Sequence, residues 1–253
     1  MKYLSIVLFA IIAFGCKNEP KIEILSANDI IDKSIEVSGG ELFRKSKVKF
    51  NFRDKFYYGQ RIDDNFVLMR VAVNEKNDSV IDILTNEGFE RKINEGKNIV
   101  VEDSMIPKYT ASVNSVHYFS VLPYGLNDKA VNKKLLGEEQ IKDKNYYKIK
   151  VTFNQEGGGE DYEDVFVYWV DKKDFKADYL AYSYNEDDGV GMRFREAYNE
   201  RYVNGIRFVD YNNYKAEDAS LKLLDLGKAF ENNQLKLLSK IELKNVEVAL
   251  INN

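Results

Sequence analysis

The strongest constraint on the fold is a two-residue alternation of apolar and polar side chains that recurs along most of the chain. Residues 47–53 (KVKFNFR) and residues 145–153 (NYYKIKVTF) place apolar side chains at every second position, which is typical of a β-strand with one buried face. The composition agrees, since 17 Tyr and 15 Phe against only 3 Pro favour long strands. The sequence therefore predicts a mainly β fold.

Short turn sequences separate the strands, and no strand–helix–strand alternation appears. Asn204-Gly205 is the clearest hairpin signal, because Asn-Gly suits the two-residue turn in which both residues have positive φ. A dozen or more strands are more than a flat sheet holds without curling, so we expect one large curved antiparallel sheet. The predicted strands are 47–53, 55–62, 65–74, 79–85, 88–94, 97–101, 145–153, 164–170, 177–184, 191–199, 200–204, 206–214, 221–226, 235–243 and 246–250.

Two helices are predicted, which makes the fold class α+β. Residues 26–40 (SANDIIDKSIEVSGG) begin with Ser26 or Asn28 as a helix cap and end on two glycines. Residues 111–122 form a second helix, and residues 124–137 are predicted to be loop or short helix. We therefore expect an N-terminal helix under the sheet and a helix-containing insertion at 111–136 that acts as a plug or lid.

The N-terminus carries the features of a lipoprotein export signal. Met1 and Lys2 give a positive start, an almost unbroken apolar run follows, and Cys16 is the only cysteine. The run is too short to cross a bilayer, which needs about 20 residues, and it matches the apolar region of a secretory signal. Residues 13–16 (AFGC) resemble a relaxed lipobox. These features predict acylation of Cys16.

This reading gives a signal peptide at 1–15, a tether at 16–25 and a single curved antiparallel β domain at 26–253. The membrane is then a partner through the N-terminal lipid, and the protein belongs in the cell envelope, at the outer membrane. Residues 17–19 (KNE) resemble the surface-export tag of Bacteroidetes lipoproteins. Both the periplasmic side and the cell-surface side of the membrane therefore remain alternatives. The alternatives are an uncleaved anchor helix and a soluble protein with an apolar tail.

Three stretches resemble a known class of proteins. They are residues 30–40 (IIDKSIEVSGG), residues 118–153, which begin YFSVLPYGLNDKAVNKKLLG, and residues 237–248 (LLSKIELKNVEV). Together with the element order, they resemble the half-barrel fold of periplasmic lipoprotein carriers and outer-membrane lipoprotein receptors. The central stretch is similar to uncharacterised lipoproteins of Bacteroidetes. The resemblance implies a curved antiparallel sheet wrapped around a helix with an apolar concavity, and it does not fix the function.

Sequence signals for chemistry are weak. The chain has 37 Lys+Arg and 41 Asp+Glu, mixed without a basic stripe, so a nucleic-acid partner is disfavoured. His117 is the only histidine and no G-x-S-x-G motif is present, so no catalytic residue is predicted. No metal site is predicted either, since one histidine suits zinc poorly and the acidic clusters at 160–164 and 186–188 lack EF-hand spacing. Glycine-rich stretches match no nucleotide fingerprint, and we expect no cofactor.

Aromatic residues on the strands and the insertion are the best candidates for a function. On a sheet bent over a helix, some of them face the concavity, where Tyr and Trp suit a cavity that opens to water. The alternative is that they only fill the core. The candidate ligand-binding residues are Tyr58, Met69, His117, Tyr118, Phe119, Tyr124, Trp169 and Tyr182.

Three functional hypotheses follow. The first is a non-enzymatic, membrane-anchored lipoprotein that binds a lipid or other hydrophobic ligand. The second is an accessory lipoprotein of an envelope complex, whose concavity is filled by its own side chains and whose aromatic patch lies outside. The third is a hydrolase-type enzyme that uses His117 with a nearby carboxylate.

Overall fold

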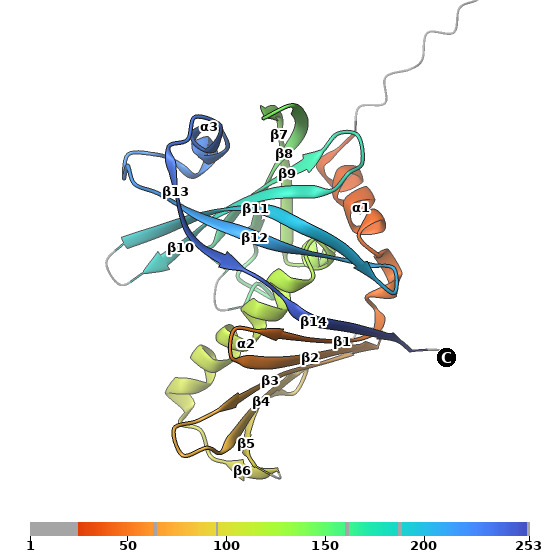
Figure 1. Cartoon of the computed structure of the whole chain (residues 1–253), viewed down its shortest axis with the longest axis vertical. Coiled ribbons are helices and arrows are strands. Elements are labelled where there is room, and N and C mark those ends of the chain that lie inside the picture. The colour runs from red at the N-terminus through yellow and green to blue at the C-terminus, as the bar shows by residue number, and fades with distance from the viewer. Residues whose placement is uncertain (1–24, 63–64, 95, 160–161, 187–188, 252–253) are drawn as a thin grey trace, which may run out of the picture.

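The computed structural model describes residues 25–62, 65–94, 96–159, 162–186 and 189–251. It confirms the predicted class, a mainly β fold with a curved antiparallel surface and helices, and the strands form two sheets of seven (Figure 1). Sheet A has the order β14-β1-β2-β3-β4-β5-β6, and sheet B has the order β13-β12-β11-β10-β9-β8-β7. Among the described residues no pairing joins β6 to β7, so the surface stays open.

Every neighbouring pair of strands in the two sheets is antiparallel. The strands of sheet A are β1 (Lys45–Phe52), β2 (Lys55–Ile62), β3 (Asn65–Val73), β4 (Ser79–Thr85), β5 (Gly88–Ile93), β6 (Lys97–Ile99) and β14 (Lys244–Leu250). The strands of sheet B are β7 (Val131–Ile141), β8 (Lys144–Phe153), β9 (Val165–Asp171), β10 (Ala177–Glu186), β11 (Gly189–Val203), β12 (Ile206–Ala216) and β13 (Leu235–Ile241). Only residues 242–243 separate β13 from β14, so the expected single surface is bent into two sheets at this point.

Helix α1 (Ala27–Val37) forms where the sequence predicts it. Ser26 caps it: the Asp29 N–H donates to Ser26 Oγ at 3.2 Å, and the Ser26 N–H donates to the Asp29 carboxylate at 2.8 Å. This reciprocal pair satisfies backbone groups that a helix end otherwise leaves without partners. Ile30 and Ile31 are fully buried against sheet B. The helix is therefore fixed to the inner face of that sheet.

The end of α1 meets the predicted hairpin. Asn204 and Gly205 have φ of 47° and 83°, as the two-residue turn requires, and they join β11 to β12. A Cβ on Gly39 would lie 3.1 Å from Ile206 Cα, so this close approach of two backbones depends on glycine.

Helix α2 (Ile106–Ser120) crosses between the two sheets (Figure 1). Val113 is fully buried with Leu68 and Leu84 of sheet A. On another side of the helix, the Phe119 ring packs against Phe166 and Tyr182 of sheet B, with ring centroids 6.0 and 5.2 Å away. One side of the helix thus packs against sheet A and another side packs against sheet B.

Sheet B is covered on both faces. Its inner face carries Ile149, Tyr168 and other members of the cluster that holds α1. Its outer face carries Trp169 and Phe194, which pack against Leu226 at the start of α3 (Leu226–Glu231). This double cover explains why β9 is a continuous apolar run, because both sets of alternating side chains leave water.

Four element predictions were wrong. Residues 221–226 contain short helical turns, not a strand, because Leu226 and its helix cover the outer face of sheet B. Residues 131–137 of the stretch predicted as loop or short helix belong instead to β7, which continues to Ile141. The strands predicted at 191–199 and 200–204 are one strand, β11, whose register shifts between Tyr198 and Arg201. The insertion helix starts at Ile106, not at residue 111.

Candidate functional site

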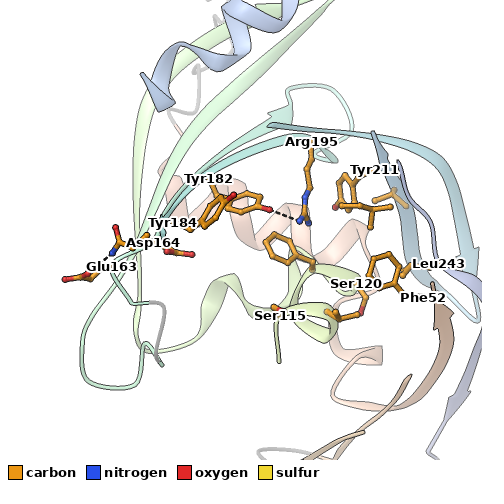
Figure 2. Close-up of a pocket in the computed structure, with 15 residues that line it drawn as sticks. Phe52, Ser115, Ser120, Glu163, Asp164, Tyr182, Tyr184, Arg195, Tyr211 and Leu243 are labelled. Atoms are coloured by element: carbon orange, nitrogen blue, oxygen red, sulfur yellow. Dashed lines mark hydrogen bonds between the residues drawn. The ribbon is translucent and has the colours of Figure 1, made fainter. Parts of the chain in front are cut away.

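A cavity of about 440 Å³ lies between α2 and the inner face of sheet B (Figure 2). It reaches sheet A at Phe52, the last residue of β1, and the bend between the sheets at Leu243. Its lining comes from elements that are far apart in the sequence. The lining residues are Phe52, Ser115, Val116, Phe119, Ser120, Glu163, Asp164, Tyr182, Tyr184, Asn185, Arg195, Val209, Tyr211, Ile241 and Leu243.

Regular secondary structure explains why these residues meet. Residues 115–116 and 119–120 recur at the three- and four-residue spacing that puts side chains on one face of a helix, here α2. The pair Tyr182 and Tyr184 on β10 and the pair Val209 and Tyr211 on β12 are spaced by two, as residues on one face of a strand are. The cavity is therefore the place where one helix stripe faces one side of three strands.

The walls are mainly aromatic and aliphatic at one end and polar at the other. Phe52 and Leu243 lie together at one end in Figure 2, and Glu163 and Asp164 lie at the opposite end beside Tyr184. The Asn185 side-chain amide donates to the Glu163 carboxylate at 2.9 Å. The cavity thus has an apolar end and an acidic end.

Among the described residues that line this cavity, Arg195 of β11 is the one cation, and 8 % of its surface is exposed. It donates from an Nη to the Tyr182 hydroxyl oxygen at 2.8 Å. Its guanidinium lies 3.9 Å from the centre of the Phe119 ring and 5.0 Å from that of Tyr182. Among the described residues no carboxylate forms an ion pair with it, and its Nε has no hydrogen-bond partner.

A smaller hollow of about 160 Å³ adjoins the cavity and shares Ser115, Phe119 and Asp164 with it. Tyr118, Phe153 and Phe166 line this hollow. Burial raises the pKa of Tyr118 to about 12, so its hydroxyl is neutral at physiological pH. Phe119 thus lines both spaces on the sheet B side of α2.

The structure brings together only part of the candidate set. Phe119 and Tyr182 line the cavity, and Tyr118 lines the adjoining hollow. Trp169 does not face these spaces: it is fully buried on the outer face of sheet B, where it packs against Phe194 with ring centroids 5.5 Å apart. Because side chains alternate along a strand, Tyr168 and not Trp169 belongs to the inner face.

The remaining candidates lie on the sheet A side. Tyr58 and Met69 are opposite one another in the β2–β3 register, on the face away from α2, and the Tyr58 hydroxyl donates to Gln60 at 2.6 Å. Tyr124 packs on Phe43 with ring centroids 4.9 Å apart. None of these three side chains lines the cavity. Sequence alternation locates strands but does not say which face of each strand turns inward.

His117 is a packed histidine between α2 and sheet A. Its ring contacts Phe50 and Tyr57 at centroid distances of 5.8 and 5.5 Å, and 2 % of the residue is exposed. Nε2 lies 3.0 Å from the Met69 carbonyl oxygen, which can only accept, so this nitrogen carries the hydrogen. Burial lowers the pKa of His117 to about 4. Within the described part of the chain no carboxylate hydrogen-bonds to this ring, so the geometry does not form a hydrolytic triad.

Several predictions fall outside what the structure describes. Cys16 and residues 17–24 of the predicted tether lie there, as do residues 160–161 and 187–188 of the two acidic clusters. Over the described residues, no group of three or more His, Cys, Asp and Glu side chains is arranged to hold a metal ion. In the same residues, no helix combines the length and the apolar character needed to cross a bilayer.

Arg195 is among the cavity-lining residues that the sequence reasoning missed, and it is the cationic one. The stretch MRFREAY alternates correctly, but the rule that the apolar set faces inward places Phe194 inside and Arg195 in water. In the structure α3 covers the outer face, so Phe194 is buried there and Arg195 points inward. The short apolar stretch at 221–226 could have indicated this, because a helix that covers the outer face of the sheet would bury Phe194 there and turn Arg195 inward.

The fold and cavity define a class of protein: a curved antiparallel β-sheet protein with helices on its inner face and an internal cavity. The chain belongs to a family of unknown function, DUF6503, whose model matches residues 21–243. No curated protein sequence matches the chain.

Solved structures of similar shape come from several bacteria. A LolA superfamily protein from Nitrosomonas europaea is 10 % identical with a TM-score of 0.48, over 91 % of this chain and 95 % of that one. A DUF1329 family protein from Desulfovibrio piger is 10 % identical with a TM-score of 0.42, over 88 % and 92 %. The lipoprotein LppX of Mycobacterium tuberculosis is 12 % identical with a TM-score of 0.27, over 64 % and 88 %.

Proposed function

We propose that this protein is a non-enzymatic envelope lipoprotein that binds a hydrophobic ligand in the cavity between α2 and sheet B. The cavity itself is the observation that carries the proposal: at about 440 Å³ it falls in the size range of small-molecule sites. Its walls include Phe52, Phe119, Val209 and Leu243. Binding there removes apolar ligand surface from water, which is favourable by about 25 cal/mol per Å².

The same space distinguishes the ligand-binding proposal from an accessory role. An accessory protein with a solid core needs no space of this size under its sheet, and empty apolar cavities lower stability. Residues of α2 and of several strands of sheet B line the cavity, so a bound ligand contacts the helix and the sheet together. These observations favour a carrier or receptor of hydrophobic molecules over a purely structural subunit.

Native mass spectrometry and lipid extraction test this proposal. The full chain with Cys16→Ala, which lacks the proposed acylation site, is purified without detergent, and bound lipids are identified. We expect a co-purifying hydrophobic ligand and saturable binding of a fluorescent fatty-acid probe. If nothing co-purifies and the probe does not bind, the proposal is wrong.

A cavity-filling variant locates the bound probe. Ile241→Trp places a bulky ring at the cavity wall, and we expect it to weaken probe binding at least about tenfold, since each 1.4 kcal/mol of lost binding is tenfold. Leu237→Trp is the matched control, because Leu237 lies on the same strand and is 48 % exposed. Equal binding by the two variants would place the ligand elsewhere.

The lipid anchor is a separate part of the proposal. Cys16 after an apolar run supports acylation at this position, and two or more acyl chains give stable anchoring. Metabolic labelling with an alkyne fatty acid should mark the protein, and Cys16→Ala should abolish the label and release the protein from the membrane fraction. Retained label in Cys16→Ala contradicts the assignment of Cys16.

A further inference from the structure

Arg195 holds an unusual position for a charged side chain. It is more than nine-tenths buried, and its one hydrogen bond to a described residue goes to a neutral hydroxyl, that of Tyr182. Burying a cation without a carboxylate is unfavourable, because the charge loses its hydration without gaining an ion pair. The position that a carboxylate would occupy beside Arg195 is therefore available to a group from a ligand.

We propose that Arg195 binds the anionic head of an amphiphile, a carboxylate attached to a single hydrocarbon chain, whose chain occupies the apolar end of the cavity. This inference rests on the proposed function and adds the chemical class of the ligand. Guanidinium groups pair well with carboxylates, and such charge-assisted hydrogen bonds are stronger than neutral ones.

The surroundings of the guanidinium prepare it for this role. The rings of Phe119, Tyr182 and Tyr211 lie 3.9, 5.0 and 5.9 Å from its central carbon and partly replace its lost hydration. The Nε–H has no hydrogen-bond partner among the described residues and is itself covered by protein atoms, so an anion in the cavity meets the guanidinium at its Nη groups. Because Tyr182 accepts from Arg195 and no described residue accepts from Tyr182, the tyrosine hydroxyl is a second donor for the same anion.

The shape of the cavity orients the rest of the ligand. Figure 2 shows Arg195 between Tyr182 and Tyr211, with Phe52 and Leu243 at one end and Glu163 and Asp164 at the other. The Glu163 carboxylate disfavours an anion at its end of the cavity, so the ligand's carboxylate is kept near Arg195 and the chain extends towards Phe52 and Leu243. A ligand with a cationic head would place its charge at the acidic end instead.

A matched pair of ligands tests the inference. Palmitic acid and palmityl alcohol share one hydrocarbon chain and differ in the charge of the head group at pH 8. Both are titrated by probe displacement into the full chain with Cys16→Ala, and into the same chain with Arg195→Met added. We expect the acid to bind at least about tenfold more tightly than the alcohol in the first protein, and the two to bind within about threefold in the second.

A control variant separates a local effect from overall charge. Arg44→Met removes one positive charge from an arginine that does not line the cavity and whose side chain is 40 % exposed. It should keep the preference for the acid. Loss of preference in Arg44→Met to the same degree as in Arg195→Met would overturn the assignment of Arg195.

The outcomes distinguish this inference from the proposed function. Equal binding of acid and alcohol to the parent protein, or an acid preference that survives Arg195→Met, overturns the role of Arg195 and leaves hydrophobic binding intact. Failure of both ligands to bind overturns the proposed function, and the inference fails with it. Preference for a long-chain amine over both would place the head group at Glu163 and Asp164 and likewise overturn the assignment.

Discussion

The two sides of α2 bury arginine in opposite ways. On the sheet A side, Arg70 and Arg91 both pair with Asp82, at 2.6 Å each, and Asp82 is 2 % exposed. Arg70 also donates to Ser112 of α2 at 2.6 Å, and Arg91 lies 3.7 Å from the centre of the Tyr109 ring. On the sheet B side, Arg195 has aromatic neighbours and a hydroxyl, with a cavity beside it.

The difference shows how one helix can serve both structure and binding. The cluster of Arg70, Arg91 and Asp82 is a complete network, in which each charge has an opposite charge within the protein. Such a network fixes the contact between α2 and sheet A, and neither arginine in it needs a charged group from a ligand. On the sheet B side, the buried charge of Arg195 has no opposite charge among the described residues, and buried charged groups in an unusual environment are typical of binding sites.

The largest effect is expected from breaking the complete network. Asp82→Asn keeps the shape of the side chain but leaves Arg70 and Arg91 without their carboxylate. Removing one partner from a buried ion pair costs about 3–5 kcal/mol, so we expect a loss of this size in the free energy of unfolding. Urea denaturation followed by circular dichroism measures it.

Glu90→Gln is the control for that measurement. Glu90 lies on β5, its side chain is 64 % exposed, and it pairs with Lys92 at 3.4 Å. Exposed pairs contribute about 0–1 kcal/mol, so this variant should unfold at nearly the wild-type urea concentration. A loss for Asp82→Asn no larger than for Glu90→Gln would mean that the buried network does not hold α2 on sheet A.

A pH-dependent effect of intermediate size is expected at His117, on the same side of α2. Burial lowers its pKa from the ordinary 6.5 to about 4, so between these values the unfolded chain binds a proton that the folded chain excludes. Stability contributed by the neutral ring is therefore complete above pH 6.5 and lost as pH falls towards 4. The expected loss is about 2 kcal/mol at pH 5 relative to pH 8.

His117→Gln tests this expectation, because a glutamine amide can donate to the Met69 carbonyl without titrating in this range. Urea unfolding at pH 5 and at pH 8 should show the wild type losing about 2 kcal/mol more than the variant between the two conditions. Parallel losses in the two proteins would show that the ring is protonated in the folded state at pH 5.

The features that could be predicted from the sequence are those set by residues that are neighbours in the chain. The Ser26 cap and the Asn204-Gly205 turn involve neighbours in the chain, and both are where the sequence places them. β7 was missed because its register shifts between Leu135 and Gly137, which moves the alternation from one face to the other within the strand. A bulge of this kind removes the two-residue period on which strand prediction depends.

The site was harder to predict than the fold because its chemistry depends on what covers each face. Phe119 and Tyr182 were found as aromatic residues on the right elements, whereas Trp169 was assigned to the wrong face. Arg195 was missed for the same reason, since α3 lets sheet B bury apolar side chains outside and turn a cation inside. Covering helices are tertiary contacts, and alternation within a strand carries no information about them.

The smallest effect on folding is expected from Arg195→Met. This variant tests directly whether Arg195 on the sheet B side of α2 differs from the paired arginines on the sheet A side. Methionine loses the contact of the cation with the Phe119 ring but no longer buries an unpaired charge. These two terms oppose each other, so the free energy of unfolding without ligand should stay within about 1 kcal/mol of the wild type. A loss as large as that of Asp82→Asn would make Arg195 a structural residue and remove the contrast. Saturating palmitate should then stabilise the wild type more than Arg195→Met, because a ligand stabilises the folded state in proportion to the logarithm of its affinity.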